Sequence, residues 1–397
     1  MPSSRVLIVV THLLGAGHLT RAAALARAFA RAGHEATLVS GGMPAPLVST
    51  EGARFVQLPP VRTRGVEFGT LLDEAGAPIG PERLAARWSA LVAALAEARP
   101  DVVVTELFPF GRRVLADEFM ALVGKARARR PRPLLLASVR DILAAPAKPE
   151  RVAETHGRLA ELYGAVLAHG DPALLPLDAS WPVDESLRPL LCYTGYVDEG
   201  GPVDAGAETE RAEIVVSGGS SAAALPLLRA AAGAAARHPD RPWRLLVGGG
   251  VGEADFTELR GTAPGHASVE RARPDFRALL ARAALSVSQA GYNTVVDLLR
   301  AGPRVLLVPF EAGRETEQRL RAESLAARGL AAVLPEAELS VEALALAVAR
   351  LLGSPAPDGH EVRLDGAAET VATVAAIMGE ASRSPLAQRG LRDALPR

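Results

Sequence analysis

The stretch RVLIVVTHLLGAGHLTRAAALARAFARAG, residues 5–33, places a strand pattern, a glycine loop and a helical pattern in direct succession. The apolar run at its start is typical of a buried strand, and Gly33 stands where the alanine-rich helix would end. Gly15 and Gly17 lie at the helix start, where unpaired N–H groups and a positive dipole end attract anions. This stretch therefore predicts a parallel α/β unit whose turn passes close to an anionic ligand.

Short apolar runs and helical patterns alternate through most of the 397 residues, which indicates an α/β fold built from parallel units. The strands that we expect are residues 5–10, 35–40, 101–105, 133–139, 164–170, 213–219, 243–249, 284–289, 304–310 and 330–334. A stretch rich in glycine and acidic residues separates the two halves and is interpreted as a linker. The predicted units are a domain over 1–197, a linker over 198–211, a domain over 212–366, and a helix with a polar tail over 367–397.

Composition excludes several classes of function. The formal net charge is −1, which gives no overall attraction to nucleic acid or to an anionic membrane. Cys192 is the single cysteine, so no intramolecular disulfide can form and a reducing compartment is expected. No apolar run reaches membrane-spanning length and no signal pattern opens the chain, so we expect a cytoplasmic protein. The basic run 125–132 is interpreted as a solvated helix end, with docking to anionic lipid as the alternative.

The second half also opens with a strand, a glycine turn and a helix, IVVSGGSSAAALPLLRAA, residues 214–231. Gly218, Gly219 and Ser220 lie where that helix begins, which is a suitable place for a diphosphate. Taken alone this signal is weak, because strand–glycine–helix turns recur in such folds for steric reasons.

A longer block, LSVSQAGYNTVVDLLRAGPRVLLVPFEAGRETEQRLRAESLAARGLAAVL, residues 285–334, narrows the interpretation. It resembles the C-terminal, nucleotide-sugar-binding half of GT-B glycosyltransferases, and most of all the N-acetylglucosaminyltransferase of lipid II synthesis in peptidoglycan assembly. The resemblance implies two Rossmann-like domains that face each other across a cleft, with the acceptor bound by 1–197 and the donor by 212–366. The donor-site residues that it implies in this block are Gln289, Gly291, Asn293, Thr294, Asp297, Glu317 and Gln318.

Within this block, Asp297 would hold the ribose hydroxyls, and Glu317 with Gln318 would contact the donor sugar. The family usually has Glu at the position of Asp297 and Gln-Gln at the positions of Glu317 and Gln318. The identity of the donor sugar is therefore left open. Asp297 has a second interpretation, because Thr294-x-x-Asp297 near a helix start is also a capping arrangement. Upstream, the main chain at Arg271 and Ala272 would pair with the uracil edge, which makes UDP an inference from the resemblance.

His18 lies in GAGHLTR, which matches the first glycine loop of the same family and places His18 on its candidate catalytic base. Gly15 and Gly17 would then face the donor. Glycosyl transfer with inversion needs one base to take the acceptor proton, and the pKa of imidazole suits this near neutrality. A polar histidine at a helix start is the alternative. The loop also resembles that of the UDP-sugar hydrolase of pseudaminic acid synthesis, in which water replaces the acceptor.

Polar residues at the ends of first-half strands are candidates for the acceptor side, because ligands of α/β sheets bind there. They are Glu106, Arg140, Asp141, His169 and Asp171. Arg140 and Asp141 could instead form a structural ion pair. Phe108 and Phe110 would either line an acceptor pocket or belong to the core. No Asp-x-Asp occurs, so neither a metal nor a cofactor is expected.

The predicted function is an inverting, metal-independent glycosyltransferase that moves a sugar, with a GlcNAc-like sugar as one candidate, from a UDP-sugar to a hydroxyl. The acceptor is open, and peripheral contact with the inner face of the membrane is compatible with the sequence. A UDP-sugar hydrolase and a non-catalytic nucleotide-sugar-binding protein are the alternatives, since fold does not determine function.

Overall fold

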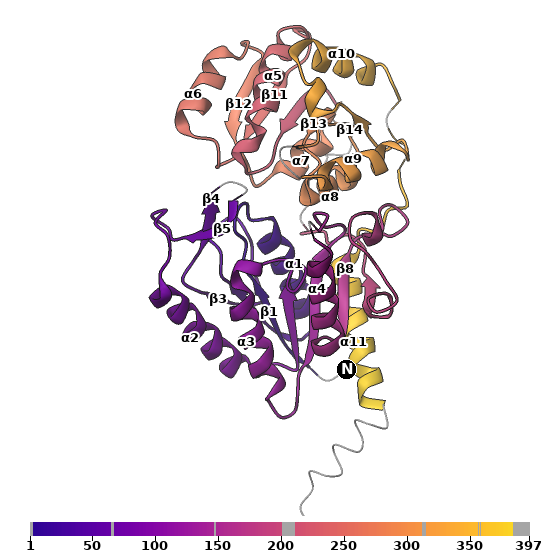
Figure 1. The fold of residues 1–397 in the computed structure, drawn as a ribbon. Coiled ribbons are helices and arrows are strands. Elements are labelled where there is room, and N and C mark those ends of the chain that lie inside the picture. Colours follow the sequence, from indigo (N-terminus) through magenta and orange to yellow (C-terminus); the bar gives the residue numbers. More distant parts are fainter. Residues whose placement is uncertain are drawn as a thin grey trace, which may run out of the picture.

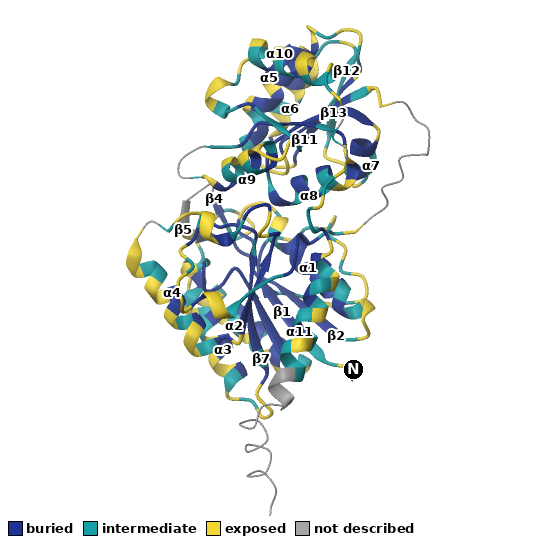
Figure 2. Cartoon of the chain, turned by 90° about the vertical axis from the view of Figure 1, so that its right-hand side faces the viewer, coloured by how far each residue is buried: buried dark blue, intermediate teal, exposed yellow. Residues whose placement is uncertain are grey.

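The computed structural model describes residues 3–64, 67–146, 148–200, 211–311, 315–355, 357 and 359–383. Two α/β domains lie one above the other, and the C-terminal helix returns from the second domain to the side of the first (Figure 1). In both domains the central strands of the sheet are buried, and the helices expose their outer faces (Figure 2). The predicted fold class is confirmed by this arrangement.

In the first domain, the described residues form a parallel sheet in the order β3-β2-β1-β6-β7-β8-β9. Its strands are β1 (Arg5–Val10), β2 (Glu35–Ser40), β3 (Arg54–Gln57), β6 (Val102–Glu106), β7 (Leu134–Arg140), β8 (Ala165–His169) and β9 (Leu191–Tyr193). The helices are α1 (Gly17–Arg31), α2 (Pro81–Ala98), α3 (Ala116–Arg127) and α4 (Pro149–Leu162), with short 3₁₀ turns η1 (Arg113–Leu115), η2 (Leu177–Ala179) and η3 (Arg188–Leu190). A small antiparallel pair joins β4 (Arg62–Arg64) and β5 (Glu67–Leu72).

In the second domain, the described residues form a parallel sheet in the order β12-β11-β10-β13-β14-β15. Its strands are β10 (Glu213–Ser217), β11 (Trp243–Val247), β12 (Ala267–Arg271), β13 (Ala283–Ser288), β14 (Arg304–Leu307) and β15 (Ala332–Val333). The helices are α5 (Leu225–Ala235), α6 (Glu253–Thr262), α7 (Phe276–Ala281), α8 (Tyr292–Ala301), α9 (Glu317–Ala326) and α10 (Val341–Leu352), with 3₁₀ turns η4 (Ala222–Ala224) and η5 (Glu336–Glu338).

The strand order reverses between β1 and β6 in the first sheet and between β10 and β13 in the second. At such a reversal, the connections leave neighbouring strands in opposite directions and open a crevice at the carboxyl ends of the strands. The loops that follow β1 and β10 are the two predicted glycine loops, and β6 ends at Glu106. The topology therefore places the candidate residues of each half at its ligand-binding position.

The last helix, α11 (Gly366–Arg383), belongs spatially to the first domain. Val374 is buried in the same apolar cluster as Val6 and Leu25, which lie on β1 and α1. A bridge between Val197 and Asp365 joins the segment before the linker to the segment before α11. The chain thus crosses between the domains twice at neighbouring places. None of the helices in the described part of the chain is long and apolar enough to cross a bilayer.

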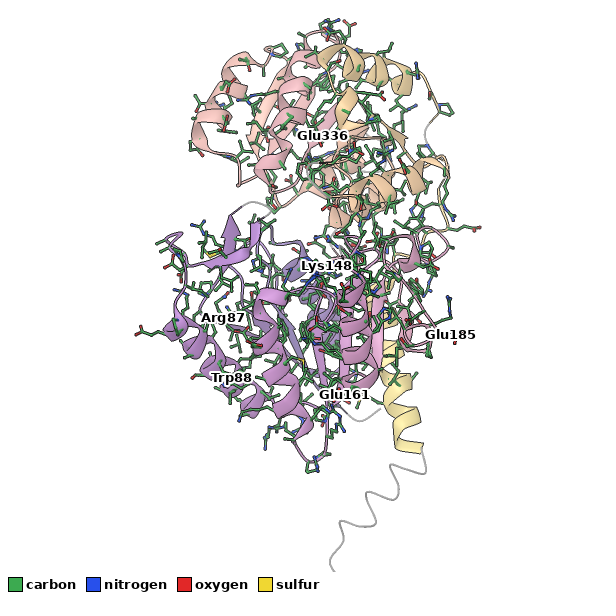
Figure 3. The ribbon with its side chains drawn as sticks, viewed as in Figure 1. Arg87, Trp88, Lys148, Glu161, Glu185 and Glu336 are labelled. Carbon is green, nitrogen blue, oxygen red and sulfur yellow. The ribbon has the colours of Figure 1, made fainter. Side chains whose placement is uncertain are left out.

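Several elements of the first domain were absent from the sequence-based expectations. These are β3, the β4–β5 pair and β9. Strands β3 and β9 are short and only partly buried, so apolar patterning signals them weakly. Arg87 lies on α2 (Figure 3), and the sequence did not indicate that its side chain is fully buried. Its guanidinium pairs with Glu118 of α3 at 2.7 Å and donates to the carbonyls of Gly41 and Pro59. Arg87 therefore ties α2 and α3 to the loop that follows β2.

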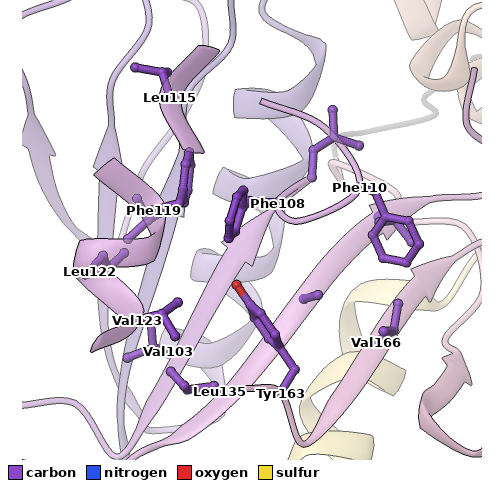
Figure 4. Close-up of a cluster of buried hydrophobic side chains, with 14 of the residues drawn as sticks. Val103, Phe108, Phe110, Leu115, Phe119, Leu122, Val123, Leu135, Tyr163 and Val166 are labelled. Atoms are coloured by element: carbon purple, nitrogen blue, oxygen red, sulfur yellow. The ribbon is translucent and has the colours of Figure 1, made fainter. Parts of the chain in front are cut away.

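Phe108 and Phe110 belong to the core. Phe108 stacks on Phe119 with ring centroids 4.9 Å apart, and Phe110 meets Trp181 edge-on at 5.2 Å. Figure 4 shows Phe108 and Phe119 side by side among the aliphatic residues of this cluster. The core alternative for these two residues is therefore correct.

Candidate active site

The glycine loop of the first domain lies directly against the second domain. A Cβ placed on Gly15 would come within 2.7 Å of Ser220 Oγ, and one on Gly17 would lie 3.8 Å from Asn293 Nδ2. Helix α1 starts at Gly17 and α8 at Tyr292, and neither has a side-chain cap. Their first N–H groups are therefore free to bind an anion where the domains meet. We call this region, Gly15–His18 with Gly218–Ser221 and the start of α8, the domain junction.

The conformation of the loop after β10 requires glycine at two positions. A Cβ on Gly218 would collide with Ala224 at the start of α5, and Gly219 has φ +73°. The loop after β11 packs against it, because Gly250 N–H donates to Ser220 O at 2.9 Å and a Cβ on Gly248 would collide with Gly219 O. This second loop was not predicted, although the glycine run 248–250 directly after a strand is a recognisable signal in the sequence.

His18 occupies the first turn of α1 and is hydrogen-bonded to the carboxylate of Glu106, with Nδ1 and Oε1 3.0 Å apart. A carboxylate only accepts, so Nδ1 carries the proton and Nε2 keeps its lone pair. The side chain of His18 is 17% exposed and that of Glu106 is 1% exposed. Within the described residues, no protein group bonds to Nε2, so this atom is available to a substrate.

Behind Glu106 runs a chain of buried hydrogen bonds. Ser138 lies opposite Glu106 in the β6–β7 register and donates to its Oε2 at 2.5 Å. The Ser138 proton is thereby used, so Ser138 Oγ accepts from His169 Nε2 at 3.0 Å, and His169 Nδ1 accepts from Thr194 Oγ1 at 2.8 Å. The structure thus places Glu106 and His169, both expected on the acceptor side, in a buried chain that orients His18.

The protonation states of this pair follow from its surroundings. Burial and the nearby charge of Arg112 lower the pKa of His18 to about 3, although Glu106 works in the opposite direction. Burial alone would raise the pKa of Glu106, but the charge of Arg21 and the hydrogen bond from His18 together hold it well below its usual range. The pair is therefore a neutral imidazole on an ionised carboxylate, which is the arrangement of a general base.

Two further arginines lie near this pair: Arg21, the last residue of GAGHLTR, and Arg112, which follows β6. The sequence assigned no role to either. Arg21 is buried, donates to Glu106 and lies over the ring of Tyr292 at 5.0 Å, so it connects the histidine–carboxylate pair to the second domain. Arg112 donates through Nε to Thr11 O at the end of β1. Both contacts depend on the fold and carry no signature in the sequence.

Arg140 and Asp141 do not pair with each other. Arg140 pairs with Glu317 of α9 at 2.6 Å, and Asp141 receives two hydrogen bonds from Arg321 of the same helix at 2.7 and 2.8 Å. The alternative of a local ion pair is therefore wrong, and each residue instead forms an ion pair with the other domain. Burial raises the pKa of Glu317 to about 7, partly offset by the charge of Arg140. We call Arg140, Asp141, Glu317 and Arg321 the interdomain clamp.

Asp297 lies in the second turn of α8, because the helix begins at Tyr292. The capping interpretation is therefore wrong. Its carboxylate accepts from Arg277 Nε at 2.9 Å, and Arg277 also donates to Asp198 at 2.6 Å. Burial raises the pKa of Asp297, and the charge of Arg277 opposes that shift. The predicted ribose ligand is thus held by an arginine that also binds the start of the linker, most of which lies outside the described residues.

Three other candidate site residues form hydrogen bonds to main-chain groups of the protein. Gln318 Oε1 accepts from the N–H groups of Ala290 and Phe310 at 3.0 and 3.1 Å, which ties together the loops after β13 and β14. Gln289 Nε2 donates to Ala223 O at 3.2 Å beside the glycine loop. Asp171 accepts from the N–H groups of Ala173 and Arg363 and so secures the returning chain.

At the end of β12, Ala272 N–H already donates to Val247 O at 2.9 Å. Its main-chain N–H is therefore used within the sheet, and only the carbonyl of Ala272 remains available to pair with a nucleobase such as uracil. The Arg271 side chain turns back to Val251 O at 2.8 Å and stacks over Phe256 with its guanidinium 4.1 Å from the ring centroid.

Known proteins are similar to this chain in sequence and in fold. Residues 213–362 match the glycosyltransferase family 28 C-terminal domain. A transferase of Burkholderia cenocepacia that moves N-acetylglucosamine from UDP-N-acetylglucosamine to N-acetylmuramyl-(pentapeptide) pyrophosphoryl-undecaprenol is 28% identical over 355 residues, 86% of this chain and 87% of the relative. The corresponding protein of Rhodospirillum centenum is 40% identical over 87 residues, which is 21% of this chain and only 23% of that protein.

The solved structure of CalG4, the calicheamicin glycosyltransferase, superposes with a TM-score of 0.61 at 19% identity, over 97% of this chain and all of CalG4. At that identity the similarity establishes the fold alone, whereas the sequence matches establish the kind of enzyme. This chain is a GT-B glycosyltransferase. Its two Rossmann-like domains meet where the glycine loops lie.

Proposed function

We propose that this glycosyltransferase is an inverting, metal-independent enzyme that transfers a sugar, with N-acetylglucosamine as the first candidate, from a UDP-sugar to a hydroxyl group. The observation that carries the proposal is the pair formed by His18 and Glu106, placed at the domain junction opposite Ser220. The similarity to transferases of UDP-N-acetylglucosamine supports the choice of donor.

The proposed reaction uses one base. His18 Nε2 takes the proton of the acceptor hydroxyl as its oxygen attacks the anomeric carbon and the bond between that carbon and the diphosphate oxygen breaks. Glu106 stabilises the imidazolium that forms, and the free N–H groups at the starts of α1 and α8 stabilise the leaving diphosphate. The negative charge of a bound diphosphate raises the pKa of His18 above its value in the free protein, which strengthens the base.

UDP release from labelled UDP-N-acetylglucosamine, measured with and without cell extract as the source of acceptor, tests this function. Transfer requires release that depends on the extract and a labelled product. Release of UDP and free sugar in buffer alone would instead indicate the UDP-sugar hydrolase alternative. Binding of UDP without any turnover would indicate a nucleotide-sugar-binding protein.

Turnover should be unchanged in EDTA. The proposed mechanism stabilises the diphosphate charge with the uncapped N-termini of α1 and α8, so it needs no divalent ion. The measurement is the initial rate of UDP release before and after dialysis against the chelator. Loss of activity that Mg²⁺ or Mn²⁺ restores would contradict the metal-independent mechanism.

Asp297→Ala should weaken UDP binding by roughly 1.5–3 kcal/mol, the range for hydrogen bonds to a charged group, if Asp297 holds the ribose. Titration calorimetry with UDP and with 2′,3′-dideoxy-UDP isolates this contact, because the dideoxy compound lacks the hydroxyls and should bind both proteins alike. Asp198→Ala is the matched control, since Asp198 also pairs with Arg277. Equal loss of affinity for both nucleotides would show that Asp297 acts through Arg277 instead.

Cytoplasmic location and peripheral contact with the membrane remain predictions.

A further inference from the structure

Asp297 uses one of its two carboxylate oxygens for contacts within the protein. Arg277, the second residue of α7, donates to Asp297 Oδ1 from Nε at 2.9 Å and from Nη2 at 2.6 Å. Within the described residues, no group donates to Asp297 Oδ2. The side chain of Asp297 keeps 16% of its surface exposed. The second oxygen is therefore available to a ligand.

Arg277 is held on its other side by the start of the linker. Its Nη2 also donates to Asp198 Oδ1 at 2.6 Å, and Asp198 Oδ2 accepts from Arg300 Nε at 2.8 Å. The guanidinium of Arg277 is 10% exposed and lies between two carboxylates, so it has little freedom to rotate. Because the guanidinium is planar and rigid, its two donors fix the direction of the Asp297 oxygen that they share.

Arg277 also balances a local excess of negative charge. Among the described residues, it is the cation that forms an ion pair with Asp297. Burial raises the pKa of Asp297, Arg277 opposes this shift, and Asp198 adds to it. Burial likewise raises the pKa of Glu199 to about 7, and the charge of Asp297 adds to that shift. Without Arg277, three carboxylates would lie together, and Asp297 would more readily take up a proton and lose its charge-assisted hydrogen bonds.

We propose that Arg277 is a positioning residue of the donor site, which fixes one oxygen of Asp297 so that the other accepts from the ribose hydroxyls. The proposal rests on the proposed function, in which Asp297 holds that ribose. Arg277 acts through Asp297 and does not contact the nucleotide. A site built to bind a hydroxyl rejects the analogue that lacks it, so this arrangement selects sugar donors of ribonucleotides over those of deoxyribonucleotides.

The experiment compares the affinities of the full chain for UDP and for 2′,3′-dideoxy-UDP by titration calorimetry. The wild type should prefer UDP by at least about tenfold, which corresponds to a hydrogen bond to a charged group. Arg277→Met removes both donors and the charge. It should reduce this preference to about threefold or less and change the affinity for dideoxy-UDP by less than about twofold. Arg277→Lys keeps the charge and one donor group, so its preference should lie between those of the wild type and Arg277→Met.

Arg300→Met is the matched control, because among the described residues Arg300 pairs with Asp198 and not with Asp297. It should keep the preference of the wild type. The proposal is overturned if the wild type binds both nucleotides alike or if Arg277→Met keeps its preference. An equal loss of affinity for both nucleotides would also overturn it, because Arg277 would then be a ligand of the diphosphate or a purely structural residue.

If Arg277→Met does not fold, Arg277→Lys decides the question, since an undiminished preference in that variant would equally overturn the proposal. The proposed function fails separately, through absence of UDP-sugar turnover.

Discussion

Replacing His18 with alanine should lower turnover by roughly a hundredfold to ten-thousandfold, the usual contribution of a positioned proton transfer. The affinity for UDP should change little, because the nucleotide is expected on the second domain and His18 belongs to the first. Initial rates and calorimetric titration of the same preparation give both quantities. His34→Ala is a suitable control, since His34 follows the other end of α1.

Two outcomes would contradict the role of His18. Near-normal turnover in the variant would mean that another group is the base. A collapse of UDP affinity together with turnover would make His18 a ligand of the diphosphate or the sugar.

The pH dependence of the rate gives an independent check. Burial disfavours the imidazolium, so the pKa of His18 lies below the ordinary value of 6.5 and the active neutral form persists to lower pH. The rate should therefore stay high as pH falls through 6.5 and decline only below it, and this decline should be absent in His18→Ala. The same decline in both proteins would assign that titration to another residue.

The second large effect concerns the buried ion pair of the interdomain clamp. Arg321→Met leaves the Asp141 carboxylate, which is completely buried, without its counter-ion. Removing one partner of a buried pair costs about 3–5 kcal/mol of stability, because a charge remains in a poorly solvating interior. Urea denaturation followed by circular dichroism measures the loss. Arg54→Met is the matched control, since Arg54 and Glu97 form an exposed pair worth at most about 1 kcal/mol.

The double variant Asp141→Asn with Arg321→Met removes both charges and should recover a large part of the lost stability. This recovery separates an unpaired charge from a simple packing defect. A single variant within about 1 kcal/mol of the wild type would mean that water reaches Asp141 when the domains move apart, and that the clamp contributes little.

The glycine loops could be predicted because their signals are local. Gly15 and Gly17 follow an apolar strand directly, and Gly218 and Gly219 do the same in the second half, so strand, turn and helix are readable from neighbouring residues. The start of α8 shows the limit of such signals. The helix begins at Tyr292, before Thr294, and this places Asp297 in its second turn rather than in a capping position.

The polar partners of His18 could not be assigned in the same way. Glu106 lies 88 residues from His18 along the chain, and they meet only because β1 and β6 are neighbours in the sheet. Strand order and register determine such contacts, and neither leaves a trace in the residues themselves. For the same reason Arg140 and Asp141, which are adjacent in sequence, find separate partners on α9.

Periodic apolar patterning and the positions of glycines by themselves determined the fold class, the two glycine loops and the placement of His18 at a helix start. They do so because hydrophobic burial and backbone freedom act over a few residues. The tertiary structure alone decided which charges are neutralised. Arg21 meets Glu106 and Arg321 meets Asp141, whereas Arg112 is left with a carbonyl, because electrostatic pairing depends on distances in space.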